Sequence, residues 1–219
     1  ETVKPGTGDK AAARGDVLLV DYTGRLDNIK DGKVFDSSKE EGRDPFPVTL
    51  GAGQVIPGWE QGLLGAKKGE VRHLSIPHYL AYGPEGKGDI PGKARLFFEV
   101  EVKEFITPGD LKQETVKPGS GEAIKSGEKG SFHYTGWLDG FAGKKKFDSS
   151  LDRNQPLDVQ IGAGMVIKGW DEGLVGMKPG EVRRLTIPYN YGYGEAGSPG
   201  GIPPYATLYF EVTYVGPAK

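Results

Sequence analysis

The sequence GAGQVIPGW at residues 51–59 recurs almost unchanged as GAGMVIKGW at residues 162–170. Working outward from this stretch, FDSS at residues 35–38 returns at residues 147–150. Matching residues stay 111 to 113 positions apart along the whole chain. A repeat of this length is a whole domain, because solenoid units run about 20 to 50 residues and must stack on their neighbours to form a core.

We therefore expect two domains, at residues 1–107 and 114–219, joined by a linker at residues 108–113. The linker begins with a Pro-Gly pair after the last strand pattern of the first copy, and ETVKPG opens both copies. A linker this short limits the relative motion of two domains without abolishing it.

The composition excludes several classes of protein. A net charge of -2 gives no electrostatic footprint for nucleic acid. Cys is absent, so there is no thiol nucleophile, disulfide or thiolate metal site, and the three His share no ligand spacing. We expect no metal, no cofactor and a monomer. With 36 Gly and 16 Pro among 219 residues, the chain is typical of a turn-rich β protein.

The sequence contains no recognisable signal for localisation. It has no apolar run near the roughly 20 residues that cross a bilayer, and its first residues lack the apolar core of a signal peptide. It also lacks an initiator Met, so we expect that residues upstream have been removed. The compartment is therefore left open, either cytoplasmic or extracytoplasmic.

Hydrophobic periodicity predicts strands and one short helix per copy. Residues 94–103 alternate apolar and mostly polar side chains, as a half-buried strand does. The helix is expected at residues 57–64 and again at 168–175, each ended by a Gly. These elements indicate an α+β domain, in which the helix covers one face of an antiparallel sheet. The remaining strands are expected at residues 17–22, 48–50, 71–76, 130–134, 159–161, 182–187 and 206–214.

Familiar catalytic motifs are missing. The GAG of residues 51–53 suggests a dinucleotide site, but Ile56 stands where the third Gly belongs and no crossover helix follows. There is also no phosphate-loop lysine, no nucleophile elbow and no Ser-His-Asp triad pattern. What recurs is a set of aromatic residues, for which an ordinary core is the simplest explanation on residue type alone: Tyr22, Phe35, Trp59, Tyr82 and Phe98, repeated as Tyr134, Phe147, Trp170, Tyr193 and Phe210.

The order of motifs resembles the FKBP-type isomerases, the macrolide-binding immunophilins. YTG is followed by FDSS, then VI-x-GW, then AYG or GYG, an Ile-Pro and a closing strand with FEV. The resemblance covers both copies almost end to end. It implies two FKBP-like domains, each a twisted antiparallel β-sheet wrapped around one short α-helix.

The resemblance also implies a substrate pocket in each copy, with a Trp as its floor, apolar walls and an Asp and an Arg on its polar side. In the first copy these residues are Trp59, Tyr22, Phe35, Phe46, Val55, Ile56, Tyr82, Ile90, Phe98, Asp36 and Arg43. In the second they are Trp170, Tyr134, Phe147, Leu157, Val166, Ile167, Tyr193, Ile202, Phe210, Asp148 and Arg153. Asp36 and Asp148 could otherwise be turn residues that open the Asp-Ser-Ser loop.

The implied reaction is rotation about an X-Pro peptide bond, with no bond made or broken. A dry apolar pocket favours the twisted amide, whose carbonyl oxygen has lost negative charge and needs water less. Proline should lie over the Trp, while the Ile56 or Ile167 N–H and the Tyr82 or Tyr193 hydroxyl donate to substrate carbonyls. Asp36 and Asp148 complete the residues implied to be catalytic.

The copies differ around the pocket, at Phe46 against Leu157 and in loops 84–89 and 195–201. We expect both to isomerise X-Pro bonds in peptides and unfolded proteins at unequal rates, and to bind macrolides of the tacrolimus or rapamycin type unequally. The alternatives are a chaperone that holds Pro-containing segments without useful turnover, and a pair in which one copy scaffolds the other.

Overall fold

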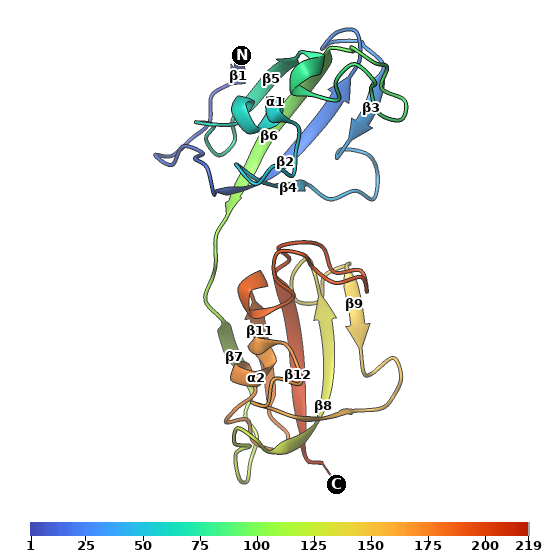
Figure 1. The fold of residues 1–219 in the computed structure, drawn as a ribbon. Helices are drawn as coiled ribbons and strands as arrows, with labels where there is room; N and C mark the ends of the chain where they lie inside the picture. The colour runs from blue at the N-terminus through green and yellow to red at the C-terminus, as the bar shows by residue number, and fades with distance from the viewer. Residues whose placement is uncertain (219) are drawn as a thin grey trace. The chain divides into compact units, whose positions relative to one another are not determined.

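The computed structural model describes residues 1–218, which divide into two compact units, residues 1–107 and residues 108–218. Each unit contains one six-stranded antiparallel sheet and one short α-helix that lies against a face of that sheet (Figure 1). The α+β class predicted from the sequence is therefore confirmed. No helix within residues 1–218 is long and apolar enough to cross a membrane.

The first sheet has the strand order β1-β5-β6-β2-β3, and β4 also pairs with β2. Strands β3 and β4 share one edge of β2, because β3 pairs with residues 23–25 and β4 with residues 17–20. The elements are β1 Thr2–Lys4, β2 Val17–Arg25, β3 Val34–Ser37, β4 Phe46–Thr49, α1 Pro57–Gly62, β5 Val71–Ile76, the 3-10 turn η1 His78–Leu80 and β6 Leu96–Ile106.

The second sheet has the same topology, with the order β10-β8-β12-β11-β7 and β9 paired to β8. Its elements are β7 Lys112–Lys117, β8 Lys129–Trp137, β9 Lys146–Ser149, β10 Leu157–Gln160, α2 Lys168–Gly173, β11 Val182–Ile187, η2 Tyr189–Tyr191 and β12 Leu208–Pro217.

The alternation predicted for the long strand is present in β6. Leu96, Phe98 and Val100 are buried, and the residues between them are half-buried on the other face. The strand begins two residues later than predicted because Lys93 has φ +59° and the Ala94 N–H closes a turn on Pro91. It also runs three residues further, because Ile106 pairs with Val17 of β2.

The helix is shorter than the sequence predicted, ending at Gly62 instead of residue 64. Two glycines bring it close to the sheet: a Cβ added at Gly58 would lie 2.3 Å from Ile76, and one added at Gly62 would lie 2.8 Å from Leu74. Only a residue without a side chain allows this approach. In α2 the end falls at Gly173 instead of residue 175, and the same two glycines recur.

Several short strands were not expected from the sequence. β1, β3, β7 and β9 contain few apolar residues, so alternation cannot reveal them. Strand β7 begins at Lys112, inside the segment interpreted as a linker, since residues 112 and 113 pair with β11.

Candidate active site

Each domain holds a cavity beside its helix, of about 330 Å³ in the first domain and about 450 Å³ in the second. The first is lined by Tyr22, Phe35, Asp36, Phe46, Gly53, Gln54, Val55, Ile56, Trp59, Tyr82, Lys87 and Phe98. The second is lined by Tyr134, Phe147, Asp148, Leu157, Gly164, Met165, Val166, Ile167, Trp170, Tyr193 and Phe210. All eleven positions of the second cavity have a counterpart in the first, so the repeat in sequence is a repeat of site geometry.

The floor of the first cavity is Trp59, which is 4% exposed. Its ring meets those of Tyr22 and Phe98 edge-on, with centroids 5.2 and 5.3 Å away. In the second domain Trp170 meets Tyr134 and Phe210 in the same way, at 5.1 and 5.4 Å. Edge-on packing fixes the indole plane from two sides. A flat aromatic surface is thereby left for a ligand ring.

The loop before each helix is held by a carboxylate from the helix itself. Glu60 accepts hydrogen bonds from the N–H groups of Gly51 and Gly53, the second at 2.9 Å. Asp171 does the same for Gly162 and Gly164, at 2.8 and 2.7 Å. This brace sets the path of the chain into Val55-Ile56 and Val166-Ile167, which form one wall of each cavity.

Asp36 forms the polar side of the first cavity. The Tyr22 hydroxyl donates to its Oδ2 at 2.6 Å, and Arg43 Nη1 donates to its Oδ1 at 2.5 Å. Partial burial opposes ionisation of Asp36, but the hydrogen bonds from Tyr22 and Arg43 outweigh it and lower the pKa of the carboxyl below its usual value. The aspartate is therefore ionised and paired at neutral pH.

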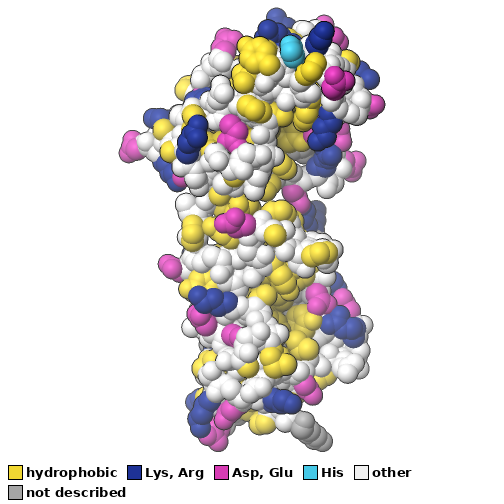
Figure 2. All heavy atoms as spheres, viewed as in Figure 1, with side chains coloured by type: hydrophobic (Ala, Val, Ile, Leu, Met, Phe, Trp, Pro, Cys, Tyr) yellow, Lys and Arg dark blue, Asp and Glu magenta, His cyan; other side chains and the backbone are white. Residues whose placement is uncertain are grey.

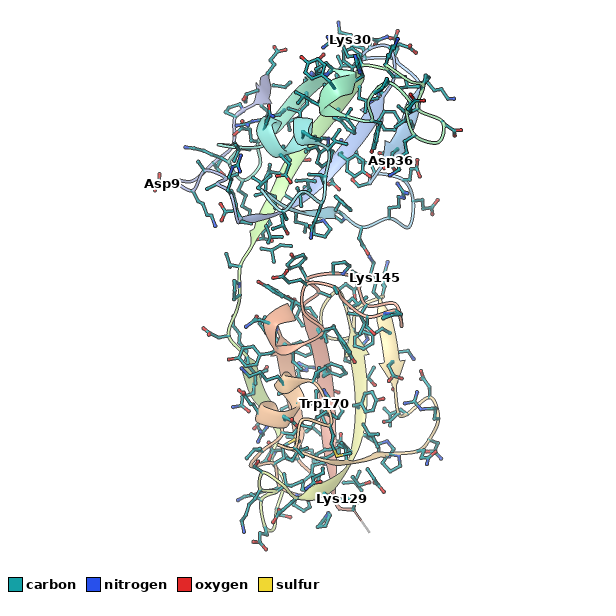
Figure 3. The ribbon with its side chains drawn as sticks, in the orientation of Figure 1. Asp9, Lys30, Asp36, Lys129, Lys145 and Trp170 are labelled. Carbon is teal, nitrogen blue, oxygen red and sulfur yellow. The ribbon has the colours of Figure 1, made fainter. Side chains whose placement is uncertain are left out.

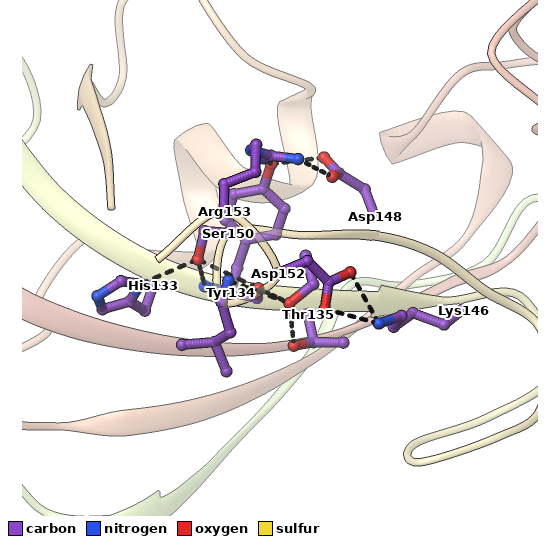
Figure 4. Close-up of polar contacts among 10 residues, drawn as sticks. His133, Tyr134, Thr135, Lys146, Asp148, Ser150, Asp152 and Arg153 are labelled. Atoms are coloured by element: carbon purple, nitrogen blue, oxygen red, sulfur yellow. Dashed lines mark hydrogen bonds and ion pairs between the residues drawn. The ribbon is translucent and has the colours of Figure 1, made fainter. Parts of the chain in front are cut away.

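Asp148 is held similarly in the second domain, by Tyr134 Oη at 2.5 Å and Arg153 Nη1 at 2.7 Å (Figure 4). Burial again opposes ionisation, and the bonds from Arg153 and Tyr134 prevail and lower the pKa. One contact differs: Arg153 Nη2 also donates to Tyr134 Oη at 3.0 Å, whereas Arg43 Nη1 donates instead to the Ser37 carbonyl at 2.8 Å.

At each cavity an Ile N–H and a Tyr hydroxyl have no hydrogen-bond partner among residues 1–218. They are the Ile56 N–H and the Tyr82 hydroxyl in the first domain, and the Ile167 N–H and the Tyr193 hydroxyl in the second. Burial, helped by the nearby Asp36, raises the pKa of Tyr82, and burial with Asp148 raises that of Tyr193. Both hydroxyls are therefore protonated donors across the physiological range.

Most of the residues that the sequence singled out line a cavity, but four do not. Arg43 and Arg153 lie behind the aspartates and contact them from outside the cavity. Ile90 packs against the first core, and Ile202 is buried in the second. Figure 3 marks Asp36 and Trp170 within their domains.

Five lining residues were not singled out: Gly53, Gln54, Lys87, Gly164 and Met165. Four of them belong to the repeated stretches 51–59 and 162–170, so membership of the repeat was the signal that could have found them. Lys87 lies in the loop where the two copies differ, and its side chain direction could not be read from the sequence.

Each cavity offers apolar walls, one aspartate whose charge is already paired, and an Ile N–H and a Tyr hydroxyl that are free to donate. No residue of either lining is a Ser, Thr, Cys or His, so the cavities hold no acyl-transfer nucleophile with its base. Within residues 1–218 no three His, Cys, Asp or Glu gather as a metal site. What such a cavity can do is bind an apolar ring, exclude water and donate to carbonyl oxygens.

Comparison with known proteins identifies the family. The profile of the FKBP-type peptidyl-prolyl cis-trans isomerases matches residues 8–103 and 120–215. The chain belongs to this family, with one isomerase domain in each half. This confirms the family that the sequence motifs indicated.

Two curated relatives align with almost the whole chain, and a third aligns with about half of it. The chain is 40% identical over 214 residues to the peptidyl-prolyl cis-trans isomerase FKBP9 of Rattus norvegicus and 40% identical over 217 residues to FKBP10 of Homo sapiens. These alignments cover 95% and 96% of this chain and 36% of each relative, so the chain spans just over a third of their length. An FK506-binding protein of Neisseria meningitidis is 54% identical over 104 residues, which is 48% of this chain and 93% of that protein.

Proposed function

We propose that both domains of this chain catalyse cis-trans isomerisation of X-Pro bonds in peptides and unfolded proteins. The observation that carries the proposal is the pair of cavities with eleven matching positions, each built on a buried Trp with two unpartnered donors at its wall. Degeneration of one copy into a scaffold would have left its cavity without these features.

In this mechanism the proline ring lies on the exposed face of Trp59 or Trp170. The Ile56 or Ile167 N–H and the Tyr82 or Tyr193 hydroxyl donate to carbonyls that flank the rotating bond. Rotation about that bond costs about 18–20 kcal/mol because it interrupts amide resonance. The apolar walls lower this barrier since the twisted amide, with less charge on its oxygen, loses less than the planar amide when water is excluded.

Asp36 and Asp148 have a positioning role in this scheme. Each aspartate is fixed by a Tyr and an Arg, so its charge is compensated before the substrate arrives. It orients the Tyr22 or Tyr134 ring, which packs edge-on against the Trp floor. The residue thus holds the cavity wall in place without exchanging a proton.

The same cavities suit macrolides of the tacrolimus or rapamycin type. Their apolar walls and volumes of about 330 and 450 Å³ are those of small-molecule sites. The unequal volumes support unequal affinity of the two domains for such ligands.

The test is exchange NMR on a Leu-Pro peptide, which needs no coupling protease. Wild-type chain should raise the exchange rate well above the uncatalysed value, which corresponds to tens of seconds. Trp59→Leu and Trp170→Leu keep an apolar side chain but remove the flat surface, so each should abolish the contribution of its own domain. The double variant should approach the uncatalysed rate.

Trp137→Leu is the matched control, because Trp137 lies in β8 outside the cavity lining. It should retain activity. A wild-type chain that binds the peptide but leaves its exchange rate unchanged would overturn the enzyme proposal and favour a Pro-segment-binding chaperone.

A further inference from the structure

Three positions distinguish the two cavities. Phe46 of the first domain corresponds to Leu157 of the second, and Gln54 corresponds to Met165. The third difference is Lys87, which lines the first cavity and has no counterpart in the lining of the second. Of these differences, only Lys87 changes the charge that a substrate meets.

The backbone of Lys87 is fixed. Its N–H donates to the Ile90 carbonyl at 3.0 Å, and the Ile90 N–H donates back to the Lys87 carbonyl at 3.0 Å. Two residues, Gly88 and Asp89, form the turn between them, and Gly88 has φ +54°. The side chain therefore starts from a closed hairpin tip and not from a loose loop.

The same reciprocal pair identifies the equivalent residue of the second domain. Ser198 donates to Ile202 at 2.9 Å and accepts from it at 3.2 Å, with three residues between them instead of two. Ser198 occupies the place of Lys87, but it is neutral, short and absent from the cavity lining. The one-residue difference between the loops is thus accompanied by loss of a cation.

The ammonium group of Lys87 lies over the Tyr82 ring, with Nζ 5.4 Å from the centroid. This cation-π contact directs it toward the hydroxyl-bearing wall of the cavity. It forms no ion pair with any carboxylate among residues 1–218. Glu85 and Asp89 of the same loop neither pair with it nor line the cavity.

The other charge in the first lining is already compensated. Asp36 is engaged by Tyr22 and Arg43, so its carboxylate is not the partner that Lys87 lacks. In the second domain Asp148 is compensated by Arg153 and no cation lines the cavity. The first cavity therefore carries one unneutralised positive charge, and the second carries none.

We propose that Lys87 is a specificity-determining residue, which makes the first domain prefer X-Pro substrates with an acidic residue directly before or after the proline, while the second domain lacks this preference. The inference rests on the proposed function, since it assumes that the cavity receives the proline and its neighbours. Lys87 selects among substrates; the rotation itself is left to the apolar bed.

The test uses the full chain and two matched peptide pairs, Ala-Glu-Pro-Phe against Ala-Gln-Pro-Phe and Ala-Ala-Pro-Glu-Ala against Ala-Ala-Pro-Gln-Ala. Glu and Gln have the same shape, so their ratio isolates charge. Amide NMR titration reports Kd for each domain separately. In the first domain at least one Glu peptide should bind about threefold tighter than its Gln partner at low salt, the size of an exposed ion pair. The second domain should show a ratio near one.

Lys87→Gln should bring the first-domain ratio to about one, and Lys87→Glu should invert it. Lys30→Gln removes the same charge from a turn that does not line the cavity, and it should keep the preference. Figure 3 shows Lys30 well away from the cavity residue Asp36. Salt near 1 M, where the screening length falls to about 3 Å, should remove the preference from wild type. Ratios near one in both domains, or a preference that survives Lys87→Gln, would overturn the inference.

Failure of the proposed function is a separate result. If neither Gln peptide exchanges faster with the chain present, the enzyme proposal is wrong, whatever the Glu-to-Gln ratio of Kd shows. If the Gln peptides exchange faster but charge has no effect on Kd, the role of Lys87 alone is wrong. Each inference is therefore tested by its own measurement.

Discussion

The first domain fills the middle of its sheet with aliphatic side chains, whereas the second uses a stacked aromatic pair. Val20 and Val102 face each other across β2 and β6, and Phe132 and Tyr214 face each other at the matching place in β8 and β12. The Phe132 and Tyr214 rings stack with centroids 5.0 Å apart, and Phe132 lies 6.3 Å from Trp170.

The larger rings are accommodated by losing a side chain nearby. Leu18 of the first domain corresponds to Gly130, where an added Cβ would lie 2.7 Å from both the Phe132 ring and Ile124. Ile124 in turn replaces the small Ala12. The two cores thus use different side chains beneath cavities whose lining positions match. Sequence divergence in these cores need not change the lining of the site.

On the surface, hydrophobic side chains are visible in the middle of the second domain among Lys, Arg, Asp and Glu (Figure 2).

The largest effect on stability should come from placing a core residue of the first domain in the core of the second. Gly130→Leu alone places a first-domain residue in the second-domain core, where there is no room for it, and should lower the free energy of unfolding by about 3 kcal/mol or more. Urea denaturation followed by amide signals of the second domain measures this loss.

The fourfold variant Ile124→Ala, Gly130→Leu, Phe132→Val and Tyr214→Val completes the exchange and should recover most of that stability. Gly200→Ala, in a loop where an added Cβ would meet nothing closer than Ser198 Oγ at 3.9 Å, controls for the effect of losing a Gly. A fourfold variant less stable than Gly130→Leu would show that the two cores are not interchangeable.

A smaller effect is expected from exchanging the rim residues Phe46 and Leu157. Phe46 is 42% exposed and packs edge-on against Tyr22 with centroids 6.1 Å apart. Phe46→Leu should weaken tacrolimus binding to the first domain about threefold, the value of one aromatic contact, and Leu157→Phe should strengthen binding to the second by a similar factor. Titration calorimetry measures both. If Phe46→Leu strengthened binding and Leu157→Phe weakened it, the Phe side chain would hinder the ligand in the smaller cavity, of about 330 Å³, instead of contacting it favourably.

The smallest difference should appear on acidification. The pKa values of Asp36 and Asp148 are lowered in the folded protein, so each carboxylate stabilises its domain above its unfolded value near pH 4 and ceases to do so as pH falls through the folded value. With Asp36→Asn or Asp148→Asn, the free energy of unfolding of the domain concerned should therefore fall less as the pH drops below about 4. Urea midpoints between pH 2 and 6 check this.

Between pH 5 and 8 the isomerase activity should stay level, because the aspartates remain ionised and the raised pKa values of Tyr82 and Tyr193 keep their hydroxyls protonated. Asp21→Asn, on a partly buried carboxylate outside the cavity lining, is the control for removing an acid elsewhere in the first domain. A titration of activity near pH 6 would contradict the positioning role given to the aspartates.

Much of the fold could be predicted because its signals are local. Alternation marked β6, a Gly-bounded segment marked the helix, and the repeat marked the two domains. The signals failed at β3 and β9, whose four residues hold too few apolar side chains to alternate, and at β7, whose six residues are all exposed. These strands form because a neighbouring strand offers hydrogen bonds to them. Their own residues do not reveal that pairing, so they could not be predicted.

The site divides in the same way. The repeat by itself determined that there are two domains. The recurring Trp, Tyr and Phe determined that each cavity has aromatic, mainly apolar walls, because residue type fixes the size and polarity of a side chain. Only the tertiary structure decided that Arg43 stands behind Asp36, that Ile90 and Ile202 join the core, and that Lys87 points over Tyr82. Those outcomes depend on the direction of the backbone in the loops, such as the hairpin closed by Lys87 and Ile90, and residue type alone does not give that direction.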